Sequence, residues 1–122
     1  MNDDKELMDV FFKEAHDLID EMRRELTSLN KETNTANLAN LFRCAHTLKG
    51  SSGIVGFNDL HELALALERI FKGAKDEKCE INPELISLLS KGIEVCQTLL
   101  DEREAEGIGE LLEQLNRIAN SK

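Results

Sequence analysis

The sequence contains no tryptophan and no tyrosine, and it has a single proline in 122 residues. Because proline interrupts helices, its scarcity leaves long stretches free to be helical. No apolar run approaches the roughly 18 residues that a membrane-spanning helix needs, so we expect no membrane insertion. The opening MNDDKELMDVFF is acidic and has no basic segment before an apolar one. That pattern argues against a secretory signal peptide and favours a cytoplasmic location.

Positive charge is also scarce, since 15 Lys and Arg residues face 24 Asp and Glu residues and the net charge is -9. Nucleic-acid binding needs a basic patch to contact phosphates, so nucleic acid is not an expected partner. Cys44, Cys79 and Cys96 are far apart and form no C-x-x-C pair. They are typical of buried free thiols in a reducing compartment, and not of a disulfide framework or zinc site.

Apolar residues recur at spacings of three and four along most of the chain, which is the period of amphipathic helices. The chain is long enough for one domain, residues 1–122, and too short for two. The spacing predicts helices over about residues 4–29, 37–53, 58–74 and 82–103, and a shorter one over about 108–119.

Two helix starts carry recognisable signals. Asn58 is a candidate N-cap for the third helix, and Asn82 followed by Pro83 is a strong start for the fourth. No stretch alternates apolar and polar residues convincingly. We therefore predict an all-α fold, an antiparallel four-helix bundle with an additional C-terminal helix docked outside it or leading onward.

The segment AHTLKGSSGIVGF, residues 45–57, is rich in glycine for a helix. Each interior glycine costs a helix about 1 kcal/mol relative to alanine, so a sequence optimised only for a bundle would not keep them. On a helix, Gly50 and Gly53 lie at i+4 and i+7 from His46 and share its face. They would leave the imidazole exposed and allow the backbone of another protein to come close.

Lys49 lies at i+3 from His46, which places an ammonium near anything attached to the ring. An imidazole nitrogen is a good nucleophile near neutral pH, and a lysine offsets phosphoryl charge. Glu68 is the candidate that fixes the second ring nitrogen, because it lies off the apolar stripe of its helix and can face the preceding helix. The alternative for Glu68 is a surface carboxylate paired with Lys72 at i+4.

The sequence contains two other histidines, His16 and His61. His61, Leu65 and Glu68 share a face at i, i+4 and i+7, so His61 and Leu65 are possible neighbours of the site. His16 lies beside the apolar stripe of the first helix, and we expect it to be partly exposed and structural.

The segment H-T-L-K-G-S-S-G, followed by G-F, closely resembles the H-x-x-K-G-x-x-G signature of histidine phosphotransfer (HPt) domains. The longer frame L-F-R-C-A-H-T-L-K-G-S-S-G-I-V-G-F is similar to the N-terminal P1 domain of CheA-type chemotaxis histidine kinases. The opening F-F-K-E-A-H-D-L-I-D-E-M resembles that family too. The similarity covers nearly the whole chain, including the helix after the bundle.

The resemblance implies a role for each residue that matches the family. His46 would be phosphorylated on Nε2, Lys49 would lie near the phosphoryl group, and Glu68 would hydrogen-bond Nδ1. Gly50 and Gly53 match the small residues beside the ring. The sequence departs from some relatives at Leu65, where they carry a second histidine, so a fuller hydrogen-bond network is not expected here.

The resemblance also implies partners. The ATP-binding domain of a histidine kinase would phosphorylate His46, and an aspartate on a response-regulator receiver domain would take the phosphoryl group. ATP and Mg²⁺ are expected on those partner domains, with no metal or cofactor bound by this one. No autonomous catalysis is expected from the domain, although its parent chain would be a histidine kinase.

Two alternatives stay open at the level of the sequence. The chain is either a P1 domain of a chemotaxis kinase or a stand-alone HPt relay protein, and the extra C-terminal helix favours the former. From a different class, it is a structural or adaptor bundle whose glycines serve close helix packing.

Overall fold

The computed structural model describes residues 2–31 and 34–120, and every regular element in them is a helix. The helices are α1 (Asn2–Lys31), α2 (Thr35–Ile54), α3 (Asn58–Lys75), α4 (Pro83–Glu102) and α5 (Ile108–Asn120). The predicted all-α class is confirmed. The largest shifts from the predicted bounds are at α1 and at the start of α2, which begins at Thr35 where residue 37 was expected.

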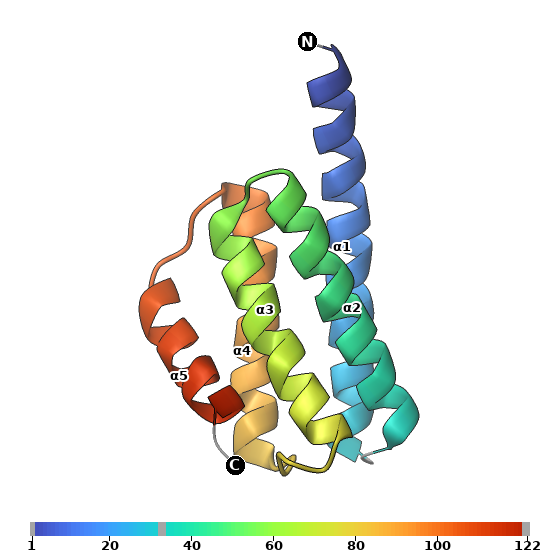
Figure 1. Ribbon diagram of the computed structural model, residues 1–122, viewed down its shortest axis with the longest axis vertical. Coiled ribbons are helices and arrows are strands. Elements are labelled where there is room, and N and C mark those ends of the chain that lie inside the picture. Colours follow the sequence, from blue (N-terminus) through green and yellow to red (C-terminus); the bar gives the residue numbers. More distant parts are fainter. Residues whose placement is uncertain (1, 32–33, 121–122) are drawn as a thin grey trace.

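The first four helices pack in a closed, antiparallel ring, α1 against α2, α2 against α3, α3 against α4, and α4 against α1 (Figure 1). α1 is the longest helix, and its N-terminal part extends past the ends of its neighbours (Figure 1). α5 packs on α3 and α4 outside the ring. Of the two predicted possibilities, docking outside the bundle is the one observed. In the described ranges, no helix combines the length and apolarity needed to cross a membrane.

The interior of the ring is filled by one apolar face of each helix, and the helical spacing predicts most of these residues. On α1, Ile19 lies in the core outside the predicted stripe, whereas Leu7, which the stripe includes, is exposed. Its largest fully buried side chains include Ile19, Met22, Leu41, Phe71 and Ile93. Burying one side chain of this size contributes about 1.5–3 kcal/mol, so the four stripes account for most of the driving force for folding.

The three cysteines are free thiols, but they are not equally buried. Cys44 and Cys96 lie in the core, and burial raises the pKa of each thiol to about 12. Cys79, in the connection between α3 and α4, is only partly buried, so the prediction of a buried thiol is wrong there.

The helix starts show where local signals succeed and fail. Asn82 caps α4 as expected, since its Oδ1 accepts the N–H of Leu85 at 2.8 Å. Asn58 is not a cap: it is the first residue of α3, and the capping position belongs to Phe57, which offers no side-chain hydrogen bond. The Phe57 ring instead packs near Phe11, with centroids 6.5 Å apart. An apolar contact, and not a side-chain cap, therefore holds the start of α3.

A glycine on α4 brings α5 close to the ring. Gly92 is buried, and a Cβ there would lie 3.2 Å from Leu67 of α3 and 3.6 Å from Leu115 of α5. The missing side chain allows three helices to meet, which seats α5 against the bundle.

Candidate functional site

α2 and α3 run antiparallel, and two pairs of residues mark how they face each other. Glu68 of α3 lies against His46 of α2. Two helical turns away, His61 of α3 lies against Gly53 of α2. Seven positions separate the members on each helix, which is two helical turns. The candidate residues from the two helices therefore lie along one flank of the bundle.

His46 projects from α2 and stays accessible, with 59% of its side chain exposed. Its ring stacks on Phe42, one turn earlier on the same helix, with centroids 5.9 Å apart and planes 16° apart. Lys75 places its ammonium 5.0 Å from the centre of the Phe42 ring. The helical spacing assigns Phe42 to the buried apolar stripe of its helix, but the residue is only partly buried and lies beside the His46 ring. An aromatic residue at i−4 from a histidine is a signal for such stacking.

Glu68 is the buried acid of the site, with only 10% of its side chain exposed. One carboxylate oxygen, Oε2, contacts His46 Nδ1, and Lys49 Nζ donates to Oε1 at 2.9 Å and to Oε2 at 3.1 Å. Burial by itself raises the pKa of this carboxyl, but the hydrogen bonds from Lys49 and His46 outweigh it and hold the pKa below its ordinary value. Glu68 is therefore a carboxylate at neutral pH.

That charge state decides which nitrogen of His46 is protonated. An ionised carboxylate only accepts hydrogen bonds, so Nδ1 of His46 must be the donor. A neutral ring then carries its lone pair on Nε2. The site thus presents an exposed imidazole whose nucleophilic nitrogen is the one that Glu68 does not occupy.

Lys49 lies on α2 with its ammonium directed to Glu68, and 25% of its side chain is exposed. The carboxylate of Glu68 thus holds both His46 and Lys49. The alternative reading of Glu68, a surface carboxylate paired with Lys72, is wrong, because Lys72 donates to Asp76 instead.

The two glycines of the motif lie in different surroundings. At Gly50 an added Cβ would meet no atom within 4 Å, so this position is open. At Gly53 an added Cβ would lie 3.1 Å from Nδ1 of His61. Gly50 has the surroundings that partner access requires, whereas Gly53 makes room for a histidine of the same chain.

His61 does neighbour this flank, and it contacts backbone. Its Nδ1 is 2.9 Å from the carbonyl oxygen of Lys49. Ser52, which is buried, also donates to that carbonyl at 3.1 Å and to the Leu48 carbonyl at 2.7 Å. Leu65 lies between His61 and Glu68 on α3 and is partly buried. The sequence pattern groups Ser52 with the small residues of the glycine-rich stretch, and so it does not predict that this hydroxyl is buried and hydrogen-bonded.

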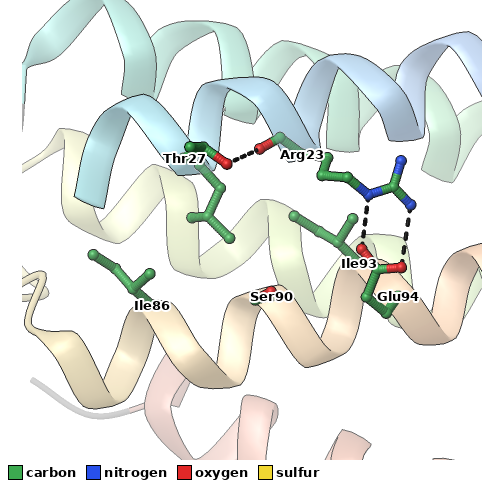
Figure 2. Close-up of a pocket in the computed structure, with 7 residues that line it drawn as sticks. Arg23, Thr27, Ile86, Ser90, Ile93 and Glu94 are labelled. Carbon is green, nitrogen blue, oxygen red and sulfur yellow. Dashed lines mark hydrogen bonds and ion pairs between the residues drawn. The ribbon is translucent and has the colours of Figure 1, made fainter. Parts of the chain in front are cut away.

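The remaining candidates lie elsewhere. His16 is partly exposed on α1, and its Nδ1 is 3.1 Å from the amide nitrogen of Gln97 on α4. A separate hollow between α1 and α4 contains Arg23 and Glu94, which face each other, and Ile86 (Figure 2). Among the side chains that the structure describes, those of residues 5–29 and 34–120, no group of three or more His, Cys, Asp or Glu is arranged to hold a metal ion.

Comparisons with known proteins identify the family and the fold. The model of the Hpt domain family matches residues 6–121. A chemotaxis protein CheA of Borreliella burgdorferi is 34% identical over 80% of this chain. The sensor histidine kinase CheAY of Helicobacter pylori is 31% identical over 82% of it. The chain spans only 12% and 13% of the lengths of these two relatives.

A solved structure shares the fold. It is the phosphorylated P1 domain of CheA3 in complex with CheY6 from R. sphaeroides, with a TM-score of 0.83 and 24% identity. The alignment covers 96% of this chain and 98% of that one. All five helices thus belong to an arrangement already seen in another protein.

Proposed function

Since the chain belongs to the Hpt domain family, we propose that His46 is its phosphoryl-carrying residue and that Nε2 is the atom that carries the group. Lys49 and Glu68 are then the residues that tune it, and Gly50 keeps the approach clear. A single observation carries the proposal: an exposed histidine in the family motif has its Nδ1 held by a buried, ionised carboxylate.

Loading proceeds by nucleophilic attack of Nε2 on the γ-phosphorus of ATP. The new N–P bond forms as the bond between phosphorus and the bridging oxygen breaks, and ADP leaves. Glu68 keeps the Nδ1 proton in place and stabilises the positive charge that develops on the ring. ATP and Mg²⁺ are held by the partner kinase domain in this proposal.

Unloading reverses the roles. A carboxylate oxygen of an aspartate on a receiver domain attacks phosphorus, the N–P bond breaks, and its electron pair returns to Nε2. The open surface at Gly50 lets the partner backbone approach. The ammonium of Lys49 and the ring of His46 both contact the Glu68 carboxylate, so they lie near each other. From there the ammonium can offset charge on the transferring group.

The relatives suggest the wider setting. Because similar proteins are chemotaxis kinases several times longer, we propose that this chain is the P1-type segment of a cytoplasmic chemotaxis sensor kinase. Its partners are then the ATP-binding domain of that kinase and one or more response-regulator receivers. The solved P1 domain in complex with CheY6 supports the choice of receiver.

The test is phosphorylation by a CheA-type kinase and labelled ATP, followed by assay of acid-labile, alkali-stable phosphate. Wild-type protein is expected to take up label and His46→Gln to take up none. His16→Gln is the matched control, because His16 is a partly exposed histidine on the α1–α4 side. It is expected to label like wild type.

An adaptor bundle makes a different prediction. Absence of label on wild type, or equal label on His46→Gln, would defeat the proposal. The surroundings of Gly50 already weigh against glycines kept only for helix packing, since no side chain packs there.

A further inference from the structure

His61 binds the backbone of the helix that carries His46. Because a carbonyl oxygen only accepts, the 2.9 Å contact with the Lys49 carbonyl requires a proton on Nδ1 of His61. A neutral His61 is therefore held in the Nδ1–H tautomer. The bond crosses from α3 to α2, and its acceptor is the residue whose ammonium holds Glu68.

The glycine at position 53 leaves room for the ring to reach that carbonyl. A Cβ there would lie 3.1 Å from Nδ1 and 3.4 Å from Cε1 of His61, so the ring would have to move by a few tenths of an ångström. The glycine that the sequence suggests for partner access thus has a second use within the chain. It admits the His61 ring to the last turns of α2.

Side chains of α3 therefore bind α2 at two places, two helical turns apart. At one point Glu68 binds the His46 ring and the Lys49 ammonium. At the other His61 binds the Lys49 backbone. Packing of buried apolar side chains sets the overall register of α2 and α3. The two attachments add constraints on sliding and rotation next to the site, where the flexible side chain of Glu68 alone would constrain them weakly.

We propose that His61, admitted by Gly53, is a positioning residue for the phosphotransfer site. It holds this part of α2 in place against α3, so that Glu68 meets Nδ1 of His46. The consequence of this positioning for phosphoryl transfer rests on the proposed function. It assigns a purpose to a histidine at a position distinct from Leu65, where some relatives have their second histidine.

The first test uses phosphoramidate, a small phosphoryl donor that needs no protein partner. His61→Ala is expected to slow labelling of His46 about fivefold, the effect of losing one orienting hydrogen bond. His61→Asn is expected to restore the rate, because its amide N–H occupies the place of Nδ1–H. His16→Leu, which removes an interhelical histidine contact on the opposite flank, is the control and is expected to keep the wild-type rate.

The second test separates the two uses of Gly53. Gly53→Ala is expected to slow phosphoramidate labelling in the wild-type background and to add no slowing in His61→Ala. If Gly53 serves only partner access, Gly53→Ala leaves the phosphoramidate rate unchanged and raises KM for the kinase equally in both backgrounds. That result would overturn the proposal.

The third readout needs no phosphoryl transfer. Nitrogen-15 shifts of the His46 ring are expected to move in His61→Ala and to return in His61→Asn. Unchanged His46 shifts and equal phosphoramidate rates in folded wild type, His61→Ala and His61→Asn would sink the positioning role. If wild type takes no label from any donor, the proposed function fails, while the His46 shifts still decide whether His61 positions the site.

Discussion

The α2–α3 and α1–α4 flanks of the bundle use similar chemical groups for different ends. On the first, Glu68 holds a histidine and a lysine; on the second, Glu94 accepts from Arg23 Nε at 2.7 Å and from a terminal guanidinium nitrogen at 3.2 Å. The Glu68 side chain is 10% exposed and that of Glu94 is 54% exposed. Water competes for the second pair and hardly for the first, so only the buried carboxylate governs the state of its partners.

The histidines of the two flanks are held in opposite ways. At His46 the carboxylate accepts from Nδ1, which leaves the lone pair on Nε2. At His16 the amide of Gln97 donates, so Nδ1 is the acceptor. The amide orientation fits its surroundings, since the same nitrogen also faces Asp101 and the amide oxygen faces Arg23. The tautomer alone does not mark the candidate phosphoryl acceptor, since His61 also carries its proton on Nδ1. His46 differs from the other two histidines in that an ionised carboxylate accepts from its Nδ1.

The largest expected contrast comes from changing each glutamate to glutamine. Glu68→Gln is expected to slow kinase-dependent phosphorylation roughly 10- to 100-fold, because a hydrogen bond to a charged group contributes about 1.5–3 kcal/mol. Glu94→Gln is expected to leave the rate unchanged, because its side chain is exposed and far from His46 in the fold. Initial rates of acid-labile label, with circular dichroism to verify folding, measure both. Equal rates for the two variants would contradict the orienting role.

The second contrast concerns the cations and is measured as stability. Lys49→Met removes a donor from a buried carboxylate and is expected to cost about 1–3 kcal/mol of unfolding free energy. Arg23→Met removes an exposed ion pair, and such pairs contribute about 0–1 kcal/mol. Urea unfolding of both variants provides the comparison. A larger loss for Arg23→Met would show that the exposed flank matters more for the fold.

The third contrast uses pH. The folded-state pKa of Glu68 lies below its ordinary value of 4.5, so ionised Glu68 contributes stability that is fully present above that value. The contribution disappears as the pH falls through the lowered folded pKa. The stability difference between wild type and Glu68→Gln is therefore expected to be constant near neutral pH and to shrink below about 4.5. Urea midpoints across pH 3–7 measure it, and a difference independent of pH would refute it.

Sequence alone predicted the five helices and placed Lys49 beside His46, since helical period and short-range spacing act locally. Glu68 lies on another helix, and its role was assigned mainly from the family resemblance. Local patterns failed where the outcome depended on another helix. Asn58 has the right residue type for a cap, yet the Phe57–Phe11 contact determines that corner. Gly53 shares the face of His46, but the sequence does not show that the His61 ring of α3 packs against it. Which residues meet across a helix contact depends on the three-dimensional packing, and no local pattern encodes it.

The smallest expected effect comes from two glycines, Gly50 on the α2–α3 flank and Gly92 where α4 meets α3 and α5. Gly50 stands in open space on α2, so Gly50→Ala meets no neighbour and is expected to stabilise the helix by about 0.5–1 kcal/mol. Gly92→Ala on α4 is expected to destabilise the fold, because its Cβ would press on Leu67 at 3.2 Å. A sequence that forgoes the gain at Gly50 does so for a reason outside its own fold. Gly50→Ala should therefore weaken transfer to a receiver domain while leaving phosphoramidate labelling unchanged. If it stabilises the protein and transfers at the wild-type rate, the open position has no part in partner access.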